Sequence, residues 1–230
     1  MDYLALAERF IAERFPDAAI GIVAGSTARD ARTPTSDIDL LLIGGSEMFE
    51  GDRTSLAATY EFQHQIFEVF AYTLDSFDEW ARRGVAEYRP VIVHMLLEGK
   101  PVRDGGPLSE LRATWRGVIE AGPTVPAHES DMRRYAITDL LDDLRDAQDP
   151  LERHVVAHTL FGKTAELMLL SNRQWIGSGK YLPRRLWQWD AARAEKLTEP
   201  LLRADFTAFA DRVEHELERA GGRVQAGFIR

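Results

Sequence analysis

Apolar residues in the first half of the chain fall into short runs and helix-like stripes, which predict a mixture of strands and helices. Residues 4–15 have helical apolar spacing and end at Pro16, which cannot continue a helix. Three apolar runs predict strands: 19–23, 40–43 and 65–72. Residues 91–97 predict a further helix, and a turn at 98–101 leads into a short strand-like pair at 102–103.

The second half of the chain has a different period. Residues 122–126 contain a glycine and two prolines, which disfavour a helix, and the segments after them have helical spacing. Two apolar stripes carry this spacing: Ile137, Leu140, Leu141 and Leu144, then Leu202, Phe206, Phe209, Val213 and Leu217. A long helix over 152–170 is expected between them. We therefore predict an α+β fold, with a mixed-sheet domain over residues 1–125 and an all-α helical bundle over residues 126–230.

Composition restricts the possible partners. The 230 residues are 45% hydrophobic, as in ordinary globular proteins, and contain no cysteine. The net charge of −9, with no long cluster of Lys or Arg, makes a nucleic-acid partner unexpected and favours a cationic small molecule. The first residues have no signal-peptide pattern, and there is no apolar run of about 18 residues that would cross a membrane. We expect a cytoplasmic protein without a membrane partner; its oligomeric state stays open.

Two carboxylates at the start of an apolar strand form the strongest candidate site. Asp37 and Asp39 are two positions apart, so strand geometry points their side chains to one face while Ile38 and Leu40 point to the other. Two such carboxylates can hold a divalent cation, and hard oxygen ligands suit Mg²⁺. Upstream, Gly25 and Ser26 predict a tight turn that offers backbone N–H groups and a hydroxyl to a phosphate, and Arg29 adds a positive charge. The alternative is that the two acids belong to a turn or a solvated strand edge.

This motif, Gly-Ser followed after ten residues by Asp-x-Asp, resembles the signature of the nucleotidyltransferase superfamily, which has the fold of DNA polymerase beta. The resemblance covers about residues 20–73. It implies a third metal-binding carboxylate on a later strand, for which Glu68 in the 65–72 run is the candidate, although a strand glutamate can also point into solvent. Ser36 is expected to support the turn into the strand that carries the metal ligands. Family members usually have Gly after the Arg, whereas this chain has Asp30, whose charge is expected to oppose nucleotide binding.

A catalytic domain followed by helices resembles kanamycin-type and lincosamide-type nucleotidyltransferases, in which the active cleft lies between the two parts. Asp139 and Asp142 stand where such enzymes carry the general base, and they lie off the apolar stripe; the alternative is a solvated helix face. The glycine-containing loop 172–182 offers Lys180 to a triphosphate. The alternative there is that the glycines cap a helix and that Trp175, Trp187 and Trp189 pack the bundle.

A second motif has the Arg-x4-His spelling. Arg153 and His158 resemble the ribonuclease motif of the helical HEPN domains that accompany minimal nucleotidyltransferases. Five positions do not place two side chains on one helical face as well as four would. The helical domain of kanamycin-type enzymes itself resembles HEPN domains, so the resemblance implies a relic and no working nuclease.

The function that follows is metal-dependent transfer of a nucleoside monophosphate, AMP from ATP or its equivalent from another nucleoside triphosphate, onto a hydroxyl-bearing small molecule. Two Mg²⁺ ions about 3.5–4 Å apart are expected at Asp37, Asp39 and Glu68. The resemblance makes an aminoglycoside-like or lincosamide-like antibiotic the expected acceptor, which would make the chain an antibiotic-resistance enzyme. Two alternatives stay open: AMP transfer to a protein, as in antitoxin-type members, and a nucleotide-binding module without turnover.

Overall fold

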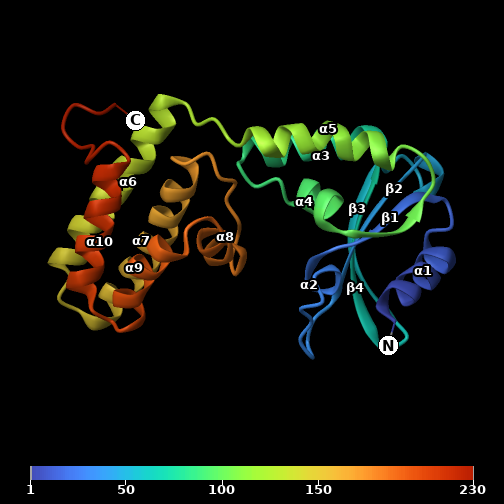
Figure 1. Cartoon of the computed structure of the whole chain (residues 1–230), viewed down its shortest axis with the longest axis horizontal. Coiled ribbons are helices and arrows are strands. Elements are labelled where there is room, and N and C mark those ends of the chain that lie inside the picture. The colour runs from blue at the N-terminus through green and yellow to red at the C-terminus, as the bar shows by residue number, and fades with distance from the viewer. Residues whose placement is uncertain (1, 230) are drawn as a thin grey trace. The chain divides into compact units, whose positions relative to one another are not determined.

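The computed structural model of the chain describes residues 2–229. The chain divides into two compact units, residues 1–120 and residues 121–230. The first unit contains the sheet, and the second contains helices and loops (Figure 1). The α+β class predicted from the sequence is confirmed.

The sheet of the first unit is mixed. Within the described residues it has five strands in the order β3-β4-β2-β1-β5. Their bounds are β1 Ala18–Val23, β2 Ile38–Gly44, β3 Ser55–Phe62, β4 Gln65–Thr73 and β5 Lys100–Asp104. The central pair β2 and β4 is parallel, whereas the other pairs are antiparallel. Because β2 and β4 are neighbours and run parallel, their first residues lie at the same end of the sheet.

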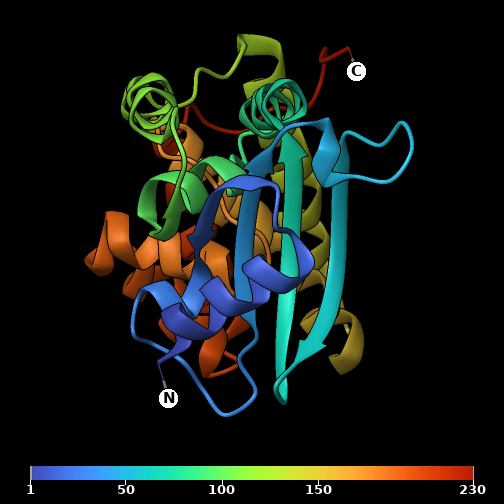
Figure 2. The same ribbon diagram turned by 90° about the vertical axis from the view of Figure 1, so that its right-hand side faces the viewer.

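Helices cover both faces of the sheet, which explains why β2 is apolar on both sides. Ile38, Leu40 and Leu42 are buried in one core with α1 (Tyr3–Arg14), which lies in front of the sheet in Figure 2. Leu41 and Ile43 are buried in a second core on the other face. That core contains residues of three helices: α3 (Leu74–Ala86), α4 (Val91–Glu98) and α5 (Leu108–Ala121). A short helix α2 (Gly25–Ala28) follows β1, and a 3₁₀ turn η1 (Ser46–Met48) follows β2.

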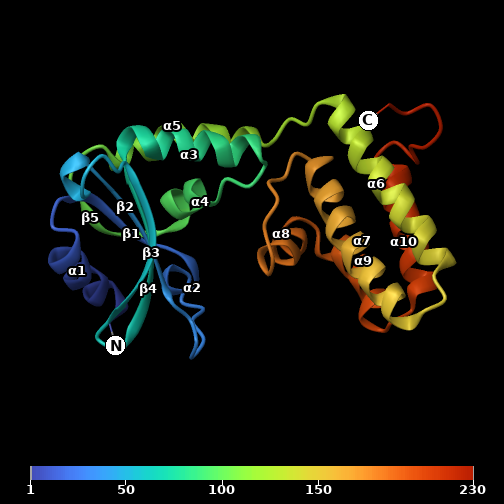
Figure 3. The same cartoon turned by 180° about the vertical axis from the view of Figure 1, so that it is seen from behind.

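The second unit is helical, as predicted. Its helices are α6 Ala127–Asp146, α7 Pro150–Leu170, α8 Tyr181–Trp189, α9 Ala191–Leu202 and α10 Phe206–Arg219. Helices α6, α7 and α10 pack against one another, and α9 lies against α8 and α10 (Figure 3). No helix among the described residues has the length and apolar character needed to cross a membrane.

One apolar stripe was assigned wrongly. The spacing placed Leu202 on the same helix as Phe206, but Leu202 ends α9 and is 84% exposed. The first helix ends before Phe206 because Ala204 has a left-handed backbone (φ 54°). Asp205 then caps the next helix by accepting a hydrogen bond from Ala208 N. The remaining members of the stripe, Phe206, Phe209, Val213 and Leu217, are buried on α10.

Candidate functional site

Strand pairing brings three carboxylates together at one end of the sheet. Asp39 is the register partner of Glu68 in the parallel pair β2 and β4, and Asp37 immediately precedes β2. One ligand oxygen from each of Asp37, Asp39 and Glu68 lies within 4.8 Å of the other two, and all three side chains are half-buried. Three hard oxygen donors at this separation can share a divalent cation. The sequence expectation that these residues meet in one place therefore agrees with the geometry, while their use as ligands stays a prediction.

The turn at Gly25, the first residue of α2, lies directly against this cluster. Gly25 has a left-handed backbone (φ +62°), and a Cβ built on it would lie 1.7 Å from Asp39 Oδ2. The backbone before Gly25 is tied to the same strand, because Ala24 N donates to Asp39 O at 2.8 Å. Only glycine satisfies both requirements, so the close approach of this turn to Asp39 is built into the sequence.

Arg29 follows α2 and belongs to a small polar network. Its guanidinium lies 3.8 Å from the carboxylate of Glu98, and His94 Nδ1 lies 2.8 Å from the other oxygen of Glu98. The Arg29 side chain is about 40% exposed, so this pair lies at the surface. The predicted contact with a phosphate is untested by this arrangement and stays a prediction.

Asp30 has a partner that the sequence did not reveal. Its backbone is left-handed (φ 54°), a conformation that Asp tolerates better than most residues and that glycine adopts freely. Lys100 Nζ lies 2.8 Å from Asp30 Oδ2, and Lys100 is the register partner of Val23, two positions before Gly25. An added positive charge therefore stands beside the negative charge that was expected to oppose a nucleotide.

Removing the charge of Asp30 and removing that of Lys100 should change nucleotide affinity in opposite directions, which allows a test. Asp30→Asn removes a negative charge and should tighten binding of the Mg²⁺–ATP complex, whereas Lys100→Met should weaken it. Each effect is expected to reach about fivefold at low salt, since two charges about 4 Å apart in water interact by about 1 kcal/mol. Both effects should fade at high salt because Asp30 is 83% exposed. If calorimetry shows that both variants bind Mg²⁺–ATP with the parent's affinity at low salt, the pair lies away from the nucleotide.

Ser36 organises the loop before β2. Its hydroxyl accepts a hydrogen bond from Thr33 N at 2.9 Å, and Ser36 N donates back to Thr33 O at 3.0 Å. These bonds close a tight turn whose second residue is Pro34, a position that proline favours. The expected support of the turn is therefore visible, and contact with a nucleotide stays a prediction.

Two basic residues that the sequence patterns did not indicate lie beside the site, Lys100 and Arg32. Arg32 donates to backbone carbonyls at the entrance of β2 and to side chains of neighbouring segments. A positive charge three residues after Arg29 was the only signal in the sequence. Its contact with Gln65, 33 positions away, depends on the pairing of β2 with β4.

In the second unit the two acids proposed as general base differ in their partners and exposure. The carboxylate of Asp142 is paired with Arg223 and accepts a hydrogen bond from Gln225 Nε2 at 3.0 Å. This pair links α6 to the segment after α10, and its hydrogen bond raises the pKa of Arg223. Asp139 is exposed on the same helix. Of the two predicted residues, Asp139 is the one that stays exposed for the role of a base.

Lys180 lies at the start of α8, in the predicted break between helices. It is exposed, with Nζ 5.6 Å from the centre of the Tyr181 ring. Among the nearby tryptophans, Trp175 is buried, as the packing alternative predicted, whereas Trp187 is 45% exposed. Trp189 is half-buried under the guanidinium of Arg193 at 4.6 Å. The bundle therefore takes one of the three fully into its core.

The Arg-x4-His pair lies on α7. The guanidinium of Arg153 stacks over Phe206 at 5.1 Å, and the same ring contacts His154 with centroids 4.8 Å apart. His158 is exposed. Arg153 thus serves the packing between α7 and α10.

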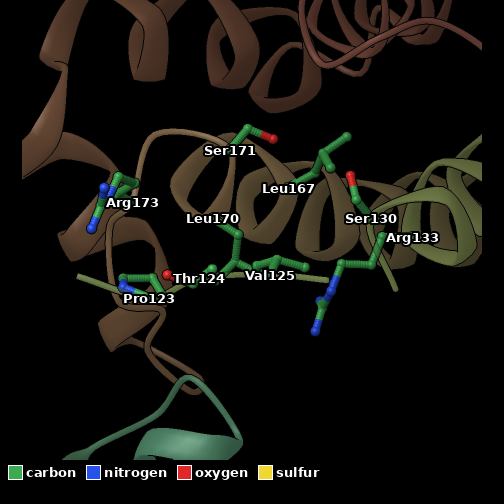
Figure 4. Close-up of a pocket in the computed structure, with 9 residues that line it drawn as sticks. All are labelled: Pro123, Thr124, Val125, Ser130, Arg133, Leu167, Leu170, Ser171 and Arg173. Carbon is green, nitrogen blue, oxygen red and sulfur yellow. The ribbon is translucent and has the colours of Figure 1, made fainter. Parts of the chain in front are cut away.

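A cavity of about 270 Å³ opens in the second unit near the start of α6 (Figure 4). Val125, Leu167 and Leu170 give it an apolar surface, and Ser130 and Ser171 add hydroxyl groups. Its two arginines are engaged already. Arg133 pairs with Glu129 and Glu166, and Arg173 donates to Ala121 O at 2.6 Å. The predicted site residues of this unit, Asp139, Asp142 and Lys180, are not part of its lining.

No family model matches the sequence, and no curated protein matches it. Among solved structures, the chain is similar to a nucleotidyltransferase-like protein from Exiguobacterium sibiricum 255-15, at 16% sequence identity and a TM-score of 0.45. That match covers 94% of this chain and 75% of the other. The assignment of function below therefore depends on the geometry of the carboxylate cluster and its glycine turn.

Proposed function

We propose that the chain is a metal-dependent nucleotidyltransferase. The observation that carries the proposal is the cluster of Asp37, Asp39 and Glu68, whose oxygens lie within 4.8 Å of one another, directly beside the turn at Gly25. A turn that offers N–H groups next to an acidic cluster suits a ligand that is both polyanionic and metal-bound. A nucleoside triphosphate with Mg²⁺ is such a ligand.

The residues present fit a divalent cation. All three donors are carboxylates, the half-buried positions reduce competition from water, and Gly25 has no side chain to fill the space beside Asp39. Asp37, Asp39 and Glu68 would hold one or two Mg²⁺ ions. When bound, Mg²⁺ neutralises phosphate charge and lowers the barrier to attack by an oxygen nucleophile.

The chain's own groups would orient the triphosphate. The N–H groups after Gly25 and the Ser26 hydroxyl would bind the phosphates, and Arg29, which follows α2, would supply a positive charge. In the reaction, an acceptor oxygen forms a bond to the α-phosphorus, the bond between the α- and β-phosphates breaks, and pyrophosphate leaves. We propose ATP as donor and AMP as the group transferred.

The proposed acceptor is a hydroxyl-bearing, cationic small molecule of the aminoglycoside or lincosamide type. A net charge of −9 attracts cations and repels polyanions such as nucleic acids. Asp139, exposed on α6, is the proposed general base for the acceptor hydroxyl. Asp142 is the second candidate, since its use requires release from Arg223.

The proposal is tested by product formation. Labelled ATP, Mg²⁺ and a panel of aminoglycosides and lincosamides should yield a labelled small molecule with the parent chain. Asp139→Asn should lower the rate by about 10²-fold, the usual contribution of a general base, whereas exposed Asp143→Asn on the same helix should not. Label found only on protein would support AMP transfer to a protein. ATP binding without any product would support a binding module instead.

A further inference from the structure

The side chain of Arg32 connects all the segments that carry the acidic cluster. Nη1 donates to Asp37 O at 2.8 Å and to Thr27 Oγ1 at 2.7 Å. Nη2 donates to Ser36 O at 2.6 Å and to Gln65 Oε1 at 3.3 Å. One half-buried guanidinium therefore contacts α2, the entrance of β2 and the start of β4.

Each contact lies next to a residue of the proposed site. Thr27 is two positions after Gly25, the Asp37 carbonyl belongs to a metal-ligand candidate itself, and Gln65 is three positions before Glu68. Since side chains extend from the backbone, fixing these three segments fixes where the carboxylates can meet. Thr27 Oγ1 also lies 3.4 Å from Asp37 O, so the guanidinium closes an existing link between α2 and β2.

The contacts of Arg32 require a planar group with two donor nitrogens, which we call a fork. Two neighbouring carbonyls, those of Ser36 and Asp37, receive one nitrogen each, and the guanidinium carbon lies 4.2 Å from the centre of the Tyr3 ring. An ammonium group keeps the positive charge but cannot direct parallel hydrogen bonds to two carbonyls while stacking on an aromatic ring.

We infer that Arg32 is a positioning residue of the proposed metal site: it holds the backbone of Ser36 and Asp37 against α2 and β4, so that Asp37, Asp39 and Glu68 converge. It acts through the ligands and not as one of them. The inference rests on the proposed function insofar as the cluster binds a divalent cation.

A matched pair of variants tests it. Arg32→Lys keeps the charge and removes the fork. Arg103→Lys is the control, because Arg103 also donates to backbone carbonyls of the first unit, those of Phe15, Pro16 and Ala18, and pairs with Glu8. Mn²⁺ alone is titrated into each protein by calorimetry, and thermal unfolding is followed in parallel.

Mn²⁺ affinity should fall about 10- to 100-fold in Arg32→Lys, the usual effect of removing a group that orients metal ligands. Arg103→Lys should bind Mn²⁺ like the parent even if its unfolding temperature falls as far. Parent-like affinity in Arg32→Lys would overturn the inference and leave the proposed function standing. Equal losses in both variants would also overturn it, because general destabilisation would then explain them. A parent chain that binds no Mn²⁺ would overturn the inference and the proposed metal site together.

Discussion

Replacing Asp37 or Asp39 with Asn is expected to lower metal-dependent nucleotidyl transfer by about 10²-fold or more while the fold survives. Asn has the size of Asp but lacks the charge that balances a cation, and a loss of 10²-fold corresponds to about 2.7 kcal/mol of the barrier. Folding should survive because the core of β2 consists of its buried apolar residues, Ile38 and Leu40–Ile43. Transfer rates across a Mg²⁺ titration and circular dichroism of each variant give the two readouts.

Glu68→Gln belongs to the same series, with exposed Glu61→Gln on the neighbouring strand β3 as its control. Glu68→Gln should shift the Mg²⁺ titration to higher concentration, since Glu68 is the register partner of Asp39, whereas the control should titrate like the parent. Unchanged activity in both Asn variants would remove the metal-site assignment. A parent-like Mg²⁺ titration in Glu68→Gln would mean that the third ligand lies elsewhere.

Gly25→Ala is expected to weaken divalent-metal binding strongly. The new methyl would lie 1.7 Å from Asp39 Oδ2 and 3.3 Å from its Cβ, so the carboxylate must turn away from the cluster or the turn must move. The left-handed backbone adds a cost of about 1–2 kcal/mol for any residue with a Cβ. We expect Mn²⁺ affinity to fall by about 10²-fold or more, as measured by calorimetry.

Gly51→Ala separates these two effects. Gly51 has nearly the same backbone conformation (φ +65°), but nothing lies within 4 Å of a Cβ built on it. Gly51→Ala should therefore lower the free energy of unfolding by the backbone cost alone, about 1–2 kcal/mol, and leave metal affinity unchanged. Mn²⁺ binding by Gly25→Ala at the parent affinity would show that Asp39 is not a ligand, or that the turn lies farther from it than the structure indicates.

The sequence predicted the elements whose apolar runs are strong. The runs at 19–23, 40–43 and 65–72 correspond to β1, β2 and β4, and the spacing after 126 gave a helical unit. In the first unit β3, α3 and α5 were missed, as were the short elements α2 and η1. Strand β3 alternates half-buried and exposed residues at a sheet edge, so it has no continuous apolar run. Helices α3 and α5 are amphipathic, with few fully buried residues each, and their pattern is diluted by charge.

The local part of the site was predictable, and its long-range part was not. Gly25, Asp37 and Asp39 are close in sequence, so strand alternation and turn chemistry were enough to place them. Partners from distant segments depend on strand pairing and helix packing. Lys100 reaches Asp30 across 70 positions, and Arg223 reaches Asp142 across 81. No local pattern indicated that these two acids would be paired.

The most direct test is a crystal structure with Mn²⁺ and a non-hydrolysable ATP analogue, in which anomalous scattering locates the metal. The proposed function predicts Mn²⁺ bound by Asp37, Asp39 and Glu68, with the phosphates against Gly25 and Ser26. An analogue bound elsewhere, with no Mn²⁺ at these three carboxylates, would contradict it.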